Sequence, residues 1–369
     1  MFPERSVEPF VLNSDTEVIS NQTEKRRAMG LPSNCGIELY QKYEKGEKNL
    51  ITDVPGVKVG HVTLIDDEKG VHTGVTAVLP HSGNIFRNKV MGGTAVINGF
   101  GKSAGLVQLE ELGTIESPIM LTNTFGVGSV LNGTVRYMLG QNPDIGDTTG
   151  TVNCIVTECN DWLLNDIRGL HVTEQDAVDA IMNACTDFEE GAVGSGTGMR
   201  CMGLKGGIGS SSRVLEIDGG KYHLGVLVMS NFGAIGEVRI DGKRFETRLN
   251  ENKEPERGSI ITLIGTDIPL SDRQLKRVAR RTAVGLARTG SYLGNGSGDI
   301  AIAFSNSNIV PHYSDKKILD TRMFFDDAID PVFEACGEAV EEAVLSSMYH
   351  SDTMKGFKDH VIYSLKEWL

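Results

Sequence analysis

The sequence predicts an α+β fold in which a pair of β-sheets is covered by helices, and three observations lead to this prediction. Short runs rich in β-branched and aliphatic residues recur from Asn49 onward and are separated by glycine. Helical patterns with apolar residues at i, i+3 and i+4 lie between some of these runs. Many neighbouring runs are joined by tight glycine turns and not by helices, which indicates antiparallel hairpins.

The predicted strands follow a polar segment at the start of the chain. Residues 1–48 are predicted to form an N-terminal arm on the surface, with residues 37–43 as a candidate short helix. The predicted strands then lie at residues 51–64, 74–80, 93–100, 117–125, 151–158, 211–217, 222–233, 259–265 and 299–306. Residues 49–369 are therefore predicted to form a single domain.

Three helices are predicted from apolar periodicity and capping residues. The clearest begins after Ser271, where Ser271 and Gln274 form a capping box and apolar residues recur as far as Leu286. A second helix follows Thr173, and a third covers residues 330–348. Helices of this kind supply the outer layers of the predicted fold.

Composition excludes several classes of function. The chain has 369 residues, and its 49 acidic and 36 basic side chains give a net charge of -13. Such a charge repels a phosphate backbone, so we expect no nucleic-acid partner and favour an amine-bearing one. The first twenty residues contain acids and no long apolar run, so we expect no secretory signal, no membrane anchor and a cytoplasmic location.

Cysteine, histidine and glycine spacing argue against the common cofactor sites. The six cysteines include no C-x-x-C pair and the eight histidines no H-x-x-x-H pair, so we expect reduced thiols, no metal and no organic cofactor. The glycine clusters lack the G-x-G-x-x-G spacing of dinucleotide-binding loops. Gly101-Lys102-Ser103 resembles the end of a phosphate loop, but that pattern needs glycine where Val96 stands.

The most informative feature lies where a charged linker meets a strand. Residues 240–258 are dense in charge and are predicted to be an exposed linker, and Ser259 opens the apolar run directly after Gly258. A serine hydroxyl there can attack the preceding carbonyl in an N-to-O acyl shift, and glycine permits a strained backbone. The freed α-amine, with a reference pKa of about 7.7–8.0, is a plausible base beside its own hydroxyl.

Several motifs in fixed order resemble the DmpA family of self-processing aminopeptidases, which includes L-aminopeptidase/D-esterases and β-peptidyl aminopeptidases. The resemblance covers about residues 49–345. Around the linker it rests on residues 258–270, 285–290 and 295–299. Upstream it rests on residues 53–61, 97–102, 108–115, 196–199, 205–209 and 230–233.

The resemblance implies a four-layer αββα sandwich, similar to N-terminal nucleophile hydrolases but with different chain connectivity. It also implies cleavage between Gly258 and Ser259 into fragments 1–258 and 259–369, the second of which has 369 − 258 = 111 residues. The two fragments are expected to stay together and to form a homo-oligomer of two-fragment units.

The resemblance assigns catalytic roles by motif. Ser259 matches the nucleophile, and Ser297 and Asp299 match the serine and acid beside it, where Asp299 orients Ser297 and Ser297 contacts the Ser259 hydroxyl or amine. The acid in this motif is often glutamate in the family, so the shorter Asp299 is a departure. Asn231 matches the side-chain amide that donates to the developing oxyanion.

The resemblance also implies the substrate class. Glu158 matches an acid that meets the free amine of the substrate, and Trp162 falls near an aromatic residue of the substrate pocket. The leading hypothesis is a serine aminopeptidase that hydrolyses small peptides, amides or esters with a free amine. Two alternatives stay open: an acyltransferase of the ornithine acetyltransferase type, which usually has threonine at the cleavage point, and a non-catalytic member of the fold.

Overall fold

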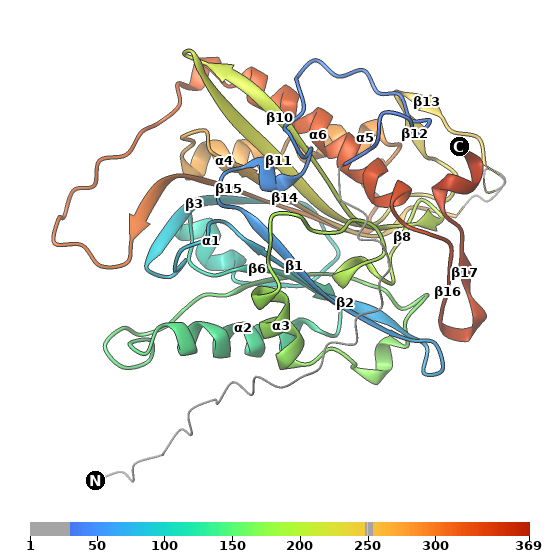
Figure 1. The fold of residues 1–369 in the computed structure, drawn as a ribbon, viewed down its shortest axis with the longest axis horizontal. Helices are drawn as coiled ribbons and strands as arrows, with labels where there is room; N and C mark the ends of the chain where they lie inside the picture. Colours follow the sequence, from blue (N-terminus) through green and yellow to red (C-terminus); the bar gives the residue numbers. More distant parts are fainter. Residues whose placement is uncertain (1–29, 248, 250–253) are drawn as a thin grey trace, which may run out of the picture.

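The computed structural model describes residues 30–247, 249 and 254–369, and two β-sheets stack face to face at its centre (Figure 1). The first sheet has the order β1-β2-β6-β7-β4, with bounds Lys58–Asp66, Val71–Leu79, Ile119–Asn123, Ile155–Cys159 and Ser103–Ala104. The second has the order β10-β11-β14-β15-β3-β5, with bounds Gly207–Ile217, Gly220–Asn231, Arg257–Thr266, Gly296–Pro311, Asn88–Gly99 and Thr114–Ile115.

Helices cover the outer face of each sheet. α2 (Val127–Gln141) and α3 (Glu174–Met182) pack on the first sheet, and α4 (Asp272–Ala279), α5 (Thr282–Arg288) and α6 (Asp330–Tyr349) lie on the side of the second (Figure 1). The described part of the chain also includes α1 (Leu106–Leu112) and three two-stranded ladders. These are β8 (Arg200–Cys201) with β9 (Leu204–Lys205), β12 (Arg239–Ile240) with β13 (Lys243–Arg244), and β16 (Met354–Lys355) with β17 (Val361–Ile362). None of the helices within the described ranges is both long and apolar enough to cross a membrane.

The apolar core is divided by the sheets into layers, which explains the sequence of β14. Ile261 and Leu263 belong to the core between the two sheets, whereas Ile260 and Ile264 belong to the core beneath α4 and α6. Successive side chains of a strand point to opposite faces, so a strand buried on both faces needs a continuous apolar run. The predicted αββα sandwich is confirmed by this arrangement.

Strand connections follow the predicted mixture of hairpins and helical crossovers. β1 with β2, and β10 with β11, form antiparallel hairpins through short turns at Gly70 and Gly219, both of which have positive φ. β14 and β15 are parallel, because α4 and α5 carry the chain between them. This parallel pair brings Ser259 and Ser297 to the same end of the second sheet.

Two details of the sequence prediction are wrong. The helix expected from Ser271 to Leu286 is two helices, because α4 ends at Ala279 and α5 begins at Thr282, although the capping box of Ser271 with Gln274 is present. The strand expected from residue 51 begins at Lys58, and residues 51–53 form a 3-10 turn before the Pro-Gly pair of residues 55–56.

The expected helix at residues 37–43 is also absent from the structure, which shows irregular chain there. The backbone N–H groups of Lys42 and Tyr43 donate to the Glu338 carboxylate of α6 at 3.0 and 3.4 Å, so a side chain replaces the partners that a helix would provide. Residues 1–29 of the expected arm lie outside the described residues. Leu31, Cys35 and Ile37 are buried in the core that α6 also lines.

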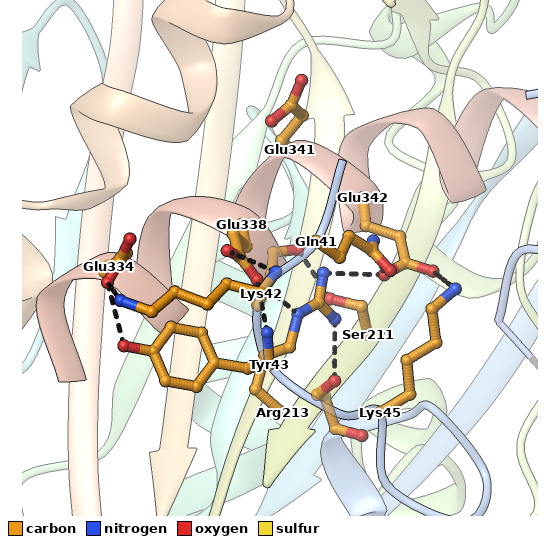
Figure 2. Close-up of polar contacts among 12 residues, drawn as sticks. Gln41, Lys42, Tyr43, Lys45, Ser211, Arg213, Glu334, Glu338, Glu341 and Glu342 are labelled. Atoms are coloured by element: carbon orange, nitrogen blue, oxygen red, sulfur yellow. Dashed lines mark hydrogen bonds and ion pairs between the residues drawn. The ribbon is translucent and has the colours of Figure 1, made fainter. Parts of the chain in front are cut away.

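Buried charges attach this segment to α6 (Figure 2). Arg213 of β10 has no exposed surface, and its guanidinium lies 3.3 Å from Glu338 and 2.9 Å from Glu342. Lys45 pairs with Glu342 at 2.6 Å, and Gln41 donates to the same carboxylate at 2.7 Å. A buried charge is costly unless it is paired, so the segment at residues 41–45 helps to compensate the carboxylates of α6.

Candidate active site

Ser259 lies at the start of β14, between two strands that supply its neighbours. It pairs with Asn231 of β11 and with Gly298 of β15, and its side chain is on the same face as Ile261 and Leu263, toward the space between the sheets. A cavity of about 480 Å³ opens beside it. Its lining includes Phe100, Lys102, Thr124, Glu158, Asn160, Trp162, Leu163, Arg200, Asn231, Glu254, Arg257, Gly258, Ser259 and Gly296.

Gly258 has a backbone that other residues adopt rarely. Its φ is +121°, and a Cβ at this position would lie 1.9 Å from the carbonyl oxygen of Asn231. The Ser259 hydroxyl donates to the Gly258 carbonyl oxygen at 2.6 Å. The hydroxyl therefore lies against the peptide group that it would attack in self-cleavage.

Ser297 and Asp299 form a hydrogen-bonded pair on the neighbouring strand. The Ser297 hydroxyl donates to the Asp299 carboxylate at 2.5 Å, and in the parallel register Ser297 stands beside Gly258. The pKa of Asp299 is raised to about 6, mainly by burial and in part by the charge of Glu256, while the hydrogen bond from Ser297 opposes the rise. The shorter acid thus reaches Ser297, while the Ser259 hydroxyl is directed to Gly258 and not to Ser297.

Asn231 is fixed by hydrogen bonds from both ends of its amide. Its Nδ2 donates to the carbonyl of Asn160 at 3.0 Å, and its Oδ1 accepts from the backbone N–H of Arg200 at 2.9 Å. Arg200 pairs with Lys205 in a short ladder, and the buried ammonium of Lys205 donates to the carbonyls of Gly196, Met199 and Gly206. Burial lowers the pKa of Lys205 to about 7. The second Nδ2 proton of Asn231 is available to a ligand.

Glu158 is a buried acid at the cavity. It is 3% exposed, one carboxylate oxygen accepts from the backbone N–H of Lys102 at 2.9 Å, and the other accepts from the Thr124 hydroxyl. Trp162 also lines the cavity but is 58% exposed. The structure thus brings Glu158 and Trp162 to the same cavity as Ser259.

Sequence reasoning missed several residues that complete this cavity. Thr124 and Asn160 stand just beyond the ends of β6 and β7, and Arg200 comes from the short ladder next to Asn231. A polar residue after a buried strand was the only signal for the first two. Among the described residues, no group of three or more histidine, cysteine or acidic side chains is placed to hold a metal ion.

The arrangement suits acyl chemistry at a serine. The Ser259 hydroxyl lies beside the paired Asn231, whose side-chain amide lines the same cavity, and the buried carboxylate of Glu158 lines it as well. An amide donor stabilises an oxyanion, and a desolvated carboxylate favours a cationic ligand. These features fit a substrate that carries an ammonium group next to a scissile carbonyl.

Comparisons with known proteins agree with this chemistry. Residues 49–362 match the model of Peptidase family S58. A Beta-peptidyl aminopeptidase BapA from Sphingosinicella microcystinivorans is 39% identical over 345 residues, which cover 87% of this chain and 86% of that protein.

Solved structures match as well. A protein from Pyrococcus horikoshii OT3 superposes with a TM-score of 0.85 at 53% identity, covering 90% of this chain and 95% of that one. The l-aminopeptidase d-ala-esterase/amidase from Ochrobactrum anthropi gives a TM-score of 0.82 at 36% identity, covering 89% of this chain and 94% of that one. The latter is described as a prototype for the serine aminopeptidases and a new variant among the Ntn hydrolase fold.

Proposed function

The chain belongs to peptidase family S58 and is a serine aminopeptidase or amidase, and we propose that it cuts itself between Gly258 and Ser259 before Ser259 serves as the nucleophile. The observation that supports this proposal most strongly is the 2.6 Å contact between the Ser259 hydroxyl and the Gly258 carbonyl oxygen, at a glycine with left-handed backbone. The other site residues act around this pair.

Self-cleavage begins when the Ser259 hydroxyl attacks the Gly258 carbonyl carbon. The C–N bond breaks, the nitrogen takes the hydroxyl proton, and an ester joins Gly258 to the Ser259 oxygen. Water then adds to the ester and releases a Gly258 carboxylate and a free Ser259 hydroxyl. Fragments 1–258 and 259–369 remain associated, because β14 stays between β11 and β15.

Substrate hydrolysis uses the new N-terminus. The α-amine of Ser259 takes the proton of its own hydroxyl, and the oxygen attacks the substrate carbonyl. The substrate C–N or C–O bond then breaks, the ammonium of Ser259 returns the proton to the departing amine or alcohol, and an acyl-enzyme remains. Asn231 donates to the oxyanion, and Asp299 holds Ser297 beside the amine. Water then hydrolyses the acyl-enzyme, which releases the carboxylic acid product and restores the Ser259 hydroxyl.

Glu158 is proposed to select substrates with a free amine. A Glu158→Gln variant is expected to lose kcat/KM for an amino-acid p-nitroanilide about tenfold to over a hundredfold, because a desolvated ion pair is worth about 1–3 kcal/mol or more. The parent is expected to ignore the N-acetylated p-nitroanilide, which has no charge to meet Glu158. Parallel kinetics on both substrates measure the ratio between them.

The control for this comparison is Glu216→Gln, which removes a charge from an exposed position of β10. It should leave the ratio unchanged. Equal losses of Glu158→Gln on the free and acetylated substrates would contradict amine recognition by Glu158 and give it a structural role. Transfer of the acyl group to an added amine in preference to water would instead support the acyltransferase alternative.

Activity is expected to rise with pH as Asp299 ionises. Since burial raises its pKa to about 6, kcat/KM should increase through that pH, where Asp299 becomes a charged carboxylate that accepts more strongly from Ser297. The Asp299→Asn variant should lack this step in its pH profile, and an unchanged step would remove Asp299 from the mechanism.

The raised pKa of Asp299 also predicts how the stability of the fold changes with pH. The folded pKa of Asp299 is about 6 and lies above the ordinary value of 3.8, so folding binds a proton between these values. The cost of ionising this buried group is therefore absent below the lower value and complete above about pH 6. Asp299→Asn should gain most stability relative to the parent above that pH, as measured by thermal unfolding.

Two-fragment units are proposed to form a homo-oligomer. The segment between β15 and α6 supports this proposal, because Ile318, Met323 and Phe325 are exposed apolar side chains there. Analytical ultracentrifugation of the processed protein would measure the assembly.

A further inference from the structure

Glu256 is the buried residue of an otherwise charged and exposed linker end. It is 2% exposed, whereas its neighbours Glu254, Pro255 and Arg257 are exposed. Sequence reasoning predicted an exposed linker as far as residue 258, and this prediction is wrong at Glu256. A carboxylate is costly to bury unless it is well hydrogen-bonded, so its contacts need a physical account.

Within the described residues, the hydrogen bonds of the Glu256 side chain and backbone N–H are made with one loop. Its carboxylate accepts from the Ser291 hydroxyl and, at 2.9 Å, from the backbone N–H of Tyr292. Its own backbone N–H donates to the Tyr292 hydroxyl at 2.7 Å. A Cβ on Gly294 would lie 2.9 Å from the Cβ of Glu256, so glycine at this position permits the close approach.

The same loop leads directly into β15, the strand of Ser297 and Asp299. It is held on its other side by Asn98 of β3, whose Nδ2 donates to the carbonyls of Gly294 and Ser297. Directly after Glu256, the parallel register of β14 and β15 pairs Arg257 with Gly296 and Gly258 with Ser297. The carboxylate of Glu256 is thus fastened two residues before the proposed scissile bond and to the loop that presents Ser297.

We propose that Glu256 is a positioning residue for self-cleavage, which holds the Gly258 carbonyl against the Ser259 hydroxyl by fastening the linker to residues 291–294. This inference rests on the self-cleavage proposed above. Attack on a carbonyl depends steeply on alignment, and only two residues, Arg257 and Gly258, separate the fixed Glu256 from Ser259. A free linker end would sample many orientations of the Gly258 peptide, whereas the clamped end samples few.

The contacts between Glu256 and residues 291–294 are also expected to persist after cleavage. These contacts do not involve the Gly258–Ser259 bond, so the new C-terminus at Gly258 stays beside the cavity. Glu254, Arg257 and Gly258 then remain part of the cavity wall. The charge of Glu256 remains near Asp299, which also interacts with the Ser297 hydroxyl and the thiol of Cys159.

Cell-free synthesis with timed quenching and intact-mass measurement tests the proposal. Glu256→Ala is expected to slow the appearance of the 111-residue fragment on the order of 10²-fold, the cost of a small misplacement of reacting groups. Glu256→Gln keeps the shape and one acceptor, so it should slow cleavage less, and Ser291→Ala should slow it by losing one of the two carboxylate contacts. Glu216→Gln, an exposed charge loss on β10, should cleave at the parent rate.

Two further measurements separate positioning from folding. In the uncut Ser259→Ala background, adding Glu256→Gln should leave the thermal midpoint nearly unchanged. In the processed enzyme, Glu256→Gln should move the Asp299 step of the kcat/KM profile to lower pH, because a charge that raises the pKa of Asp299 is lost.

The outcomes distinguish this inference from the proposed function. A parent chain that never cleaves would overturn self-cleavage itself. A parent that cleaves together with Glu256 variants that cleave equally fast would overturn only the positioning role. An unmoved Asp299 step would show that the clamped segment leaves the site after cleavage, and a slowing matched by a loss of folded protein would make Glu256 merely structural.

Discussion

A Ser259→Ala chain is expected to remain a single polypeptide of about 39.9 kDa and to show no measurable turnover, whereas the parent gives two fragments. The substitution removes the hydroxyl that attacks Gly258, and without cleavage no free amine exists to act as the base. Alanine is smaller than serine and keeps the backbone pairing of residue 259 with Asn231 and Gly298, so the fold should persist. Intact mass, sequencing of the new N-terminus and hydrolysis of an amino-acid p-nitroanilide are the measurements.

Ser307→Ala provides the matched control, because Ser307 lies on β15 beyond the site. This variant should split and turn over as the parent does. The proposed mechanism would fail if the parent chain had full activity and only the intact mass. It would also fail if the new N-terminus were not Ser259-Ile260-Ile261.

The fold could be predicted because its signals are local. The apolar run of β14 is long enough for a strand and too short for a helix, and Ser271 with Gln274 marks a helix start by side-chain chemistry alone. The helix expected at residues 37–43 fails for the opposite reason. Its backbone N–H groups bind Glu338, nearly three hundred residues away, and no local pattern reveals such a partner.

The site was predictable where a motif carries its chemistry and unpredictable where distant segments meet. The Gly258-Ser259 pair can be recognised in the sequence, and glycine at position 258 predicts the left-handed backbone that the structure shows there. Thr124, which donates to Glu158, and Ser291, which donates to Glu256, are ordinary hydroxyl residues in the sequence. Their role depends on sheet order and loop packing, which periodicity does not fix.

Asn231→Ala is expected to lower kcat by roughly 10²–10³, the usual cost of losing one oxyanion donor, with a much smaller change in KM. One Nδ2 proton of Asn231 is donated to the carbonyl of Asn160, so the other Nδ2 proton is the one that would be donated to the oxyanion. The variant also leaves the backbone N–H of Arg200 without its acceptor, and a loss of stability could then be mistaken for a loss of catalysis.

Asn306→Ala separates these two effects. Asn306 also donates its amide to backbone carbonyls, those of Pro55 and Pro80, but it lies at the far end of β15. Its loss should lower the thermal midpoint without lowering kcat. Steady-state kinetics on fully processed protein, at a temperature well below both midpoints, give the comparison. A kcat of Asn231→Ala within about twofold of the parent would remove Asn231 from the site, because a donor to the transition state must appear in kcat.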